Sequence, residues 1–129
     1  MARILCDTHI YFWWVRGDPK LPDVIGQALE NRANEVLVSS VVAWELATKY
    51  RLGKWPPARI VLDEMDKVIV ARGLLTLPIT LRHAEIAGMF PAAHRDPFDR
   101  ILAAQAEVED VVLATVDAVF RQFNVKLLG

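Results

Sequence analysis

The chain has 129 residues, a length typical of one domain, and hydrophobic residues make up 53% of it. Its 15 lysines and arginines are balanced by 16 aspartates and glutamates, which argues against a module that holds nucleic acid through positive charge alone. The single cysteine, Cys6, excludes a disulfide framework within the chain and is compatible with a reducing cytoplasm.

Short apolar runs typical of strands alternate with longer stretches of helical period. In chain order we expect a strand at 3–6, helices at 8–16 and 23–32, a strand at 35–39, helices at 40–53 and 59–73, a strand at 74–79, helices at 80–90 and 96–109, and strands at 111–115 and 125–128. This alternation predicts one α/β domain over residues 1–129, with a parallel sheet flanked by helices on both faces. The apolar start is too short for a signal peptide or a membrane span, so a soluble cytoplasmic protein is expected.

Two aspartates follow predicted strands. Asp7 comes directly after the strand at 3–6, and Asp117 lies two residues beyond the strand at 111–115. In parallel sheets, ligands bind outside the carboxyl ends of the strands, where the strand order reverses. Both carboxylates would enter one crevice if these strands are neighbours. Ordinary turn chemistry at a strand end is the alternative for each.

Two further acids lie on the apolar sides of predicted helices. Glu45 falls on the same side as Val41 and Val42, and Asp99 lies on the face of Leu102 and its small neighbours. A buried carboxylate needs a partner. For Glu45 this is either a metal ion or a basic side chain, Lys49 or Arg100. For Asp99, together with Asp96, the alternative is a role in starting the helix.

Four converging carboxylates predict a bound cation. At about 4–6 Å they would repel one another by roughly 3–4 kcal/mol per pair at an effective dielectric near 20. A fold tolerates this by protonating some of them or by binding cations. Mg²⁺ and Mn²⁺ prefer oxygen ligands and retain water, and such ions support hydrolysis at phosphorus. The acids therefore favour phosphodiester hydrolysis.

Four segments carry a family resemblance: LCDTHIYFWW, SSVVAWELATKYRLGK, HRDPFDRILAAQA and LATVD, in this order. In this spacing they resemble the PIN-domain ribonucleases, and most of all the VapC-type toxins of bacterial type II toxin–antitoxin modules. The resemblance implies a five-stranded parallel sheet, Mg²⁺- or Mn²⁺-dependent endoribonuclease activity and inhibition by a small antitoxin protein. It also implies a homodimer, which the apolar composition favours independently.

Carried over by position, the resemblance assigns catalysis and metal binding to Asp7, Glu45, Asp99 and Asp117. Asp96 matches a further acid of the subgroup, and Val116 departs from it, because many relatives have a polar residue there. For Asp96 the two roles, additional acid and N-cap, both remain open.

Other polar residues near these acids have weaker assignments. Thr115 could bind water or phosphate beside the acids, and strand propensity explains it equally well. Arg95 and Arg100 could contact RNA phosphates at the rim of the site. His94 is placed in a solvated loop in preference to a role as a base.

Alternatives to the toxin nuclease follow from the same acids. A phosphoaspartyl phosphatase requires two acids spaced by one residue after the first strand, where this chain has DTH. A receiver domain requires its phosphoacceptor aspartate after the third strand, and LLTLPIT contains none, so both fit poorly. A PIN-like module that only binds RNA or protein would be expected to have lost at least one acid, and all four are present. An RNA-processing nuclease without an antitoxin remains open.

Overall fold

The computed structural model describes residues 1–129 and contains a sheet of five parallel strands in the order β3-β2-β1-β4-β5. The strands are β1 (Arg3–Cys6), β2 (Glu35–Ser39), β3 (Leu75–Leu77), β4 (Val112–Ala114) and β5 (Leu127–Leu128). The predicted α/β fold with a parallel sheet is therefore confirmed. Because β1 lies between β2 and β4, the strand order reverses beside β1.

Seven α-helices and one short 3₁₀ helix connect the strands. They are α1 (Thr8–Arg16), α2 (Asp23–Glu30), α3 (Ser40–Arg51), α4 (Ala58–Asp63), α5 (Met65–Arg72), α6 (Leu81–Met89), α7 (Pro97–Glu109) and the 3₁₀ helix η1 (Ala118–Gln122). None of these helices has the length and apolar character required to cross a membrane.

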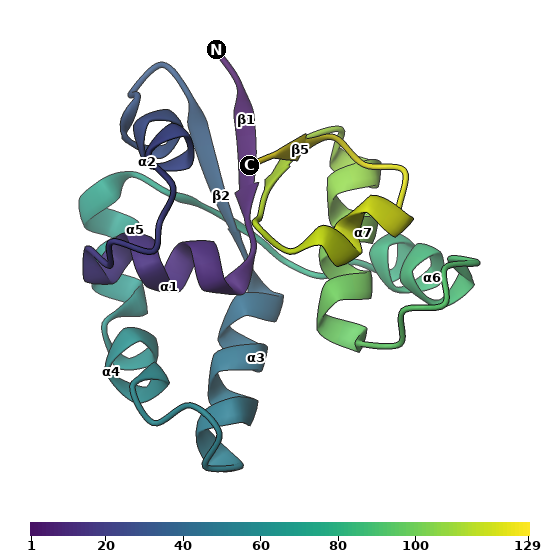
Figure 1. Ribbon diagram of the computed structural model, residues 1–129, viewed down its shortest axis with the longest axis horizontal. Helices are drawn as coiled ribbons and strands as arrows, with labels where there is room; N and C mark the ends of the chain where they lie inside the picture. The colour runs from purple at the N-terminus through teal and green to yellow at the C-terminus, as the bar shows by residue number, and fades with distance from the viewer.

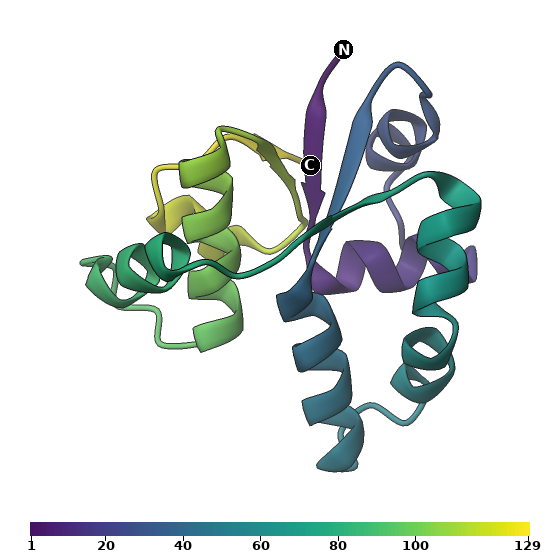
Figure 2. The ribbon, with the colours of Figure 1, turned by 180° about the vertical axis from the view of Figure 1, so that it is seen from behind.

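The helices cover both faces of the sheet, as Figures 1 and 2 show: α1, α2, α4 and α5 lie on one side of β1 and β2, and α6 and α7 lie on the other. The side chains of β1 alternate between two apolar cores. Ile4 and Cys6 belong to the core shared with α1 and α2, whereas Leu5 belongs to the core shared with α7. Both faces of β1 are thus buried, which explains its continuous apolar run.

The expected helix at 59–73 is wrong as a single element, because it is interrupted at Glu64 into α4 and α5. The 3₁₀ helix η1 was not predicted, and several element ends lie one or two residues inside the expected bounds. Gly53 and Gly73 adopt left-handed backbone angles, with φ of 72° and 65°, just beyond the ends of α3 and α5. A residue without a Cβ adopts this conformation without strain and ends a helix.

The carboxyl ends of the central strands point to the edge at which three helices begin. In Figure 1, β1 and β2 end just above the start of α1 and the start of α3, and α7 begins on the other side of the same edge. Residues at the first turns of these helices are therefore brought to one place, outside the reversal point of the sheet.

Candidate active site

A cavity of about 340 Å³ opens at this edge of the sheet, and five carboxylates line it. They belong to Asp7, Glu45, Asp96, Asp99 and Asp117. The four acids predicted from the sequence therefore share one cavity, together with the predicted additional acid. Lys49 is the one lysine of the lining, and no arginine lines the cavity.

Asp7 follows β1 and begins α1. Its Oδ1 accepts a hydrogen bond of 2.8 Å from the backbone N–H of Ile10, so the side chain caps the helix. Asp7 is only 6% exposed. Burial raises its pKa to about 6; hydrogen bonds from Thr115 and Ile10 oppose this effect, and the charges of Asp99 and Glu45 add to it. A carboxyl held this way carries a negative charge at neutral pH at a free-energy cost.

Glu45 lies in the second turn of α3 and is 4% exposed. The Thr8 hydroxyl donates a short hydrogen bond to Glu45 Oε1, and Lys49 Nζ lies 2.6 Å from Oε2. The ion pair with Lys49 considered from the sequence is thus present, and it forms inside the cavity that the other acids line. The pairing with Arg100 is absent.

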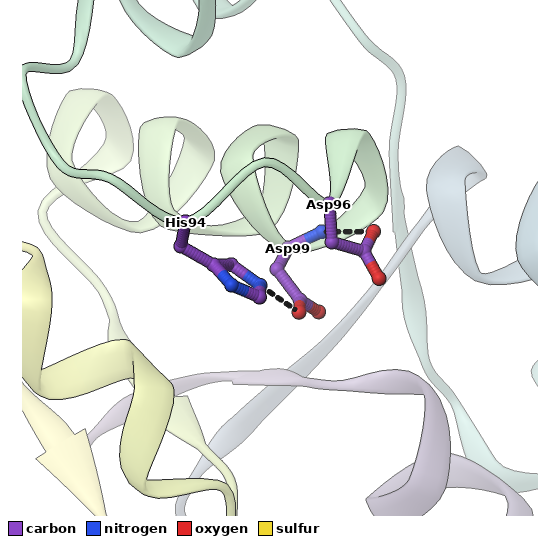
Figure 3. A group of neighbouring side chains, drawn as sticks. All are labelled: His94, Asp96 and Asp99. Carbon is purple, nitrogen blue, oxygen red and sulfur yellow. Dashed lines mark hydrogen bonds and ion pairs between the residues drawn. The ribbon is translucent and has the colours of Figure 1, made fainter.

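Asp99 lies in the first turn of α7, and Asp96 caps that helix. Asp96 Oδ1 accepts hydrogen bonds from the backbone N–H groups of Phe98 and Asp99, at 2.8 and 3.4 Å. His94 Nε2 lies 2.7 Å from Asp99 Oδ2, and Figure 3 shows the imidazole directed at this carboxylate. Burial raises the pKa of Asp99 to about 6, while the hydrogen bond from His94 opposes the rise. His94 thus lies in a loop, as expected, but its side chain is only partly exposed and contacts Asp99.

Asp117 is the most open of the four acids. It follows β4 and caps η1, where its Oδ1 accepts a hydrogen bond of 3.0 Å from Val119 N–H. The buried Thr115 hydroxyl accepts a hydrogen bond of 3.0 Å from the backbone N–H of Asp117. Thr115 thus forms hydrogen bonds with the backbone of Asp117 and with the side chain of Asp7.

The oxygen donors suit a hard divalent cation, which takes carboxylate ligands and retains water. Within the chain, His94, Asp96 and Asp99 form the one group of three side chains whose ligand atoms lie within 4.8 Å of one another. The four predicted acids share the cavity, but their carboxylate oxygens do not all lie within 4.8 Å of one another. Asp7 and Asp117 accept hydrogen bonds from backbone amides, and Glu45 is held by Lys49.

The two arginines predicted at the rim differ. Arg95 is exposed and forms no hydrogen bond or ion pair within the chain. Arg100 instead donates hydrogen bonds of 2.7–3.0 Å to the backbone carbonyls of Ala87, Phe90, Ala92 and His94. The expectation that Arg100 contacts substrate is corrected: its guanidinium holds the loop between α6 and α7.

An aromatic wall adjoins the acids. We use this name for His9 and Trp13, which line the cavity, and Trp55 behind them. The His9 and Trp55 rings stack at 4.8 Å with 22° between their planes. The spacing of His9 and Trp13, four residues apart in the helix that Asp7 starts, places both rings on one helix face and could have indicated the wall.

A larger cavity, about 610 Å³, lies away from the acids, between Trp14, Glu30, Arg72 and the start of β2. Trp14 donates a hydrogen bond of 2.7 Å to Glu30, and the Arg72 guanidinium lies 4.7 Å from the centre of the Trp14 ring. These polar groups already satisfy one another. Glu30 is the one acid that lines this cavity, so the smaller cavity with its five carboxylates is the candidate active site.

Comparisons with known proteins find matches along nearly the whole chain. Residues 4–126 match the PIN domain. Ribonuclease VapC22 of Mycobacterium tuberculosis is 30% identical over 118 residues, which cover 91% of this chain and 88% of the relative. VapBC2 of Rickettsia felis, solved with a fragment of promoter DNA, aligns with a TM-score of 0.68 at 19% identity over 98% of this chain and 97% of that one. FitAcB of Neisseria gonorrhoeae aligns with a TM-score of 0.67 at 19% identity, over 98% and 96% of the two chains.

Proposed function

This chain belongs to the PIN-domain family, and from that premise we propose that it is a metal-dependent endoribonuclease that hydrolyses RNA phosphodiester bonds. The observation that carries the proposal is the cavity at the carboxyl edge, where five carboxylates from distant parts of the sequence converge. A fold that gathers so many like charges around a single lysine favours the binding of a cation that compensates them at neutral pH.

Asp7, Glu45 and Asp99 hold one or two Mg²⁺ ions in this proposal, with Asp117 assisting; Mn²⁺ is an alternative ion. Bound there, a divalent ion lowers the pKa of a water molecule and offsets the charge that develops on the phosphate. The chain's own residues orient these carboxylates: Thr8 donates to Glu45, His94 contacts Asp99, and Thr115 donates to Asp7. Asp96 starts α7 and so fixes the position of Asp99.

The partners follow from the relatives. The 30% identity to a VapC ribonuclease supports an RNA substrate, and the fold similarity to VapBC and FitAB complexes supports a role as the toxin of a type II toxin–antitoxin pair. A cognate antitoxin protein then inhibits the chain. We also propose a homodimer, because Leu81 and Met89 of α6 leave large apolar side chains exposed.

An RNA cleavage assay tests the proposal. Wild-type protein is incubated with single-stranded RNA in Mg²⁺, in Mn²⁺ and in chelator, beside Asp99→Asn. We expect cleavage only with the ion and only in the wild type. Cleavage that persists in chelator and in Asp99→Asn would contradict the mechanism. Binding of RNA without any cleavage would instead identify a PIN-like binding module, and cleavage by a protein with no antitoxin partner would identify an RNA-processing nuclease.

A further inference from the structure

We propose that the aromatic wall of the cavity binds an unpaired base of single-stranded RNA next to the bond that is cut. This inference rests on the proposed ribonuclease function and names the contact by which the substrate is held. The observation behind it is that His9 and Trp13 line the same cavity as Asp7, Glu45 and Asp99.

The wall is held in place before any ligand arrives. His9 and Trp13 lie four residues apart on α1, and their ring centres are 5.7 Å apart. Trp55 stacks against His9, and the buried Phe12 contacts Trp55 with ring centres 4.6 Å apart. A ring supported from behind loses little freedom when a base stacks on it.

The exposure of His9 argues against a purely structural role. Its neighbours on either side, Thr8 and Ile10, are buried, whereas His9 is exposed although apolar rings surround it. A histidine needed only to fill the core would lie with them. An exposed ring beside a polar cavity offers a flat surface to a flat ligand, and nucleobases are such ligands.

The charge of the protein favours such a contact. Five carboxylates line the cavity, and the chain as a whole has a net charge of -1, so the RNA backbone gains little attraction from the protein. Lys49, whose Nζ lies 5.8 Å from the centre of the Trp55 ring, is already paired with Glu45. Stacking supplies affinity that does not depend on positive charge.

The geometry also selects the form of the substrate. A base stacks on a side chain only when it has left its own helix, so the wall favours single-stranded segments and loops over duplex RNA. Because stacking tolerates any base, the wall contributes affinity and fixes the position of the RNA strand. It does not need hydrogen bonds that identify the base.

A fluorescence binding titration tests the inference without cleavage. It uses a short single-stranded oligoribonucleotide that contains 2-aminopurine, with chelator present. We expect wild-type protein to quench the 2-aminopurine and His9→Ala to bind about tenfold more weakly. His9→Phe, which keeps a ring, should restore binding. Tyr50→Ala is the matched control, because Tyr50 is an exposed aromatic residue outside the cavity and should leave binding unchanged.

A second arm uses wild-type protein alone, so it does not depend on the folding of a variant. Oligoribonucleotides with one abasic nucleotide at successive positions should show one position at which binding falls about tenfold. Equal binding of every abasic RNA, or equal weakening by His9→Ala and His9→Phe, would overturn the inference. If the base stacks but Mg²⁺ produces no cleavage, the proposed function fails and the base site stands. If cleavage is metal-dependent but insensitive to His9→Ala, the proposed function stands and the base site fails.

Discussion

His94 Nε2 lies 2.7 Å from Asp99 Oδ2, so a residue of the loop before α7 contacts the acid in the first turn of that helix. Both side chains are shielded, with exposed fractions of 24% and 17%. The backbone carbonyl of His94 also accepts a hydrogen bond from Arg100, which fixes the loop. The direction of the Asp99 carboxylate therefore depends on a residue outside its own helix.

Replacing His94 should weaken metal binding rather than folding. In His94→Ala, Asp99 loses its hydrogen-bond partner, and we expect Mn²⁺ affinity and cleavage rate to fall about 10-fold or more, as for partners that orient metal ligands. Titration of Mn²⁺ by electron paramagnetic resonance measures the affinity directly. His94→Gln, whose amide nitrogen reaches a similar position, should recover most of the loss. Equal affinities in His94→Ala and wild type would show that the contact does not orient Asp99.

Much of the site could be predicted because its acids occupy positions that the fold fixes. Asp7 follows an apolar strand whose bounds the sequence defines sharply, and Glu45 lies on an otherwise apolar helix face. Once a parallel sheet is inferred, both must lie at the carboxyl edge. The strands that precede Asp7 and Asp117 are neighbours, because β1 pairs with β4, so the condition under which both carboxylates enter one crevice is met.

What the sequence could not give are contacts made by residues that follow no periodic pattern. The side chain of His94 folds back on Asp99 because Arg100 holds the loop, and no local signal reports that. The interruption at Glu64 lacks a glycine or proline, and backbone hydrogen bonds from Glu64 N–H to Ile60 and from Val68 N–H to Glu64 keep the helical period through it. Such details depend on tertiary packing.

Arg100 should prove structural. Replacing it by methionine leaves four backbone carbonyls without their donor, and we expect the free energy of unfolding to fall by about 2–4 kcal/mol. Chemical denaturation measures this. Arg95→Met is the matched control, because Arg95 is exposed and unpaired and should leave stability unchanged. If Arg95→Met weakens RNA binding at constant stability, the predicted rim contact of Arg95 is supported. A stable Arg100→Met protein would refute the structural role.

Lys49 should compete with the metal for Glu45. Lys49→Met removes the ammonium 2.6 Å from Glu45 and leaves a carboxylate that is 5% exposed without its partner. We expect the metal-free protein to lose about 1–3 kcal/mol of stability, less than for a fully buried pair, since Lys49 is 30% exposed.

In the same variant, Mg²⁺ should bind several-fold more tightly and restore the stability, which calorimetric titration and thermal unfolding would both detect. Lys54→Met, at an exposed lysine without an ion pair, provides the comparison. Unchanged or weaker Mg²⁺ binding in Lys49→Met would remove Glu45 from the set of metal ligands.

The raised pKa values of Asp7 and Asp99, both about 6, predict how the metal-free protein responds to pH. The unfolded chain ionises these carboxyls near their ordinary pKa of 3.8, whereas the folded chain retains their protons up to about 6. Between these values the folded state binds more protons than the unfolded state. These two groups therefore make the free energy of unfolding fall as pH rises through this window and level off above it.

Asp7→Asn isolates the share of one group, because the amide oxygen still accepts the N–H of Ile10 and the helix cap is kept. At pH 7 in chelator we expect this variant to be more stable than the wild type by about 2 kcal/mol, a gain that disappears near pH 4. Mg²⁺ should stabilise the wild type at pH 7 and stabilise Asp7→Asn far less. The variant lacks the Asp7 carboxylate as a metal ligand, and it also lacks the repulsion between that carboxylate and its acidic neighbours. Denaturation curves at three pH values, with and without Mg²⁺, measure all of these differences. If Asp7→Asn is no more stable at pH 7 than at pH 4 relative to wild type, then the carboxylate of Asp7 is not held at a cost, and the case for a cation that relieves it is lost.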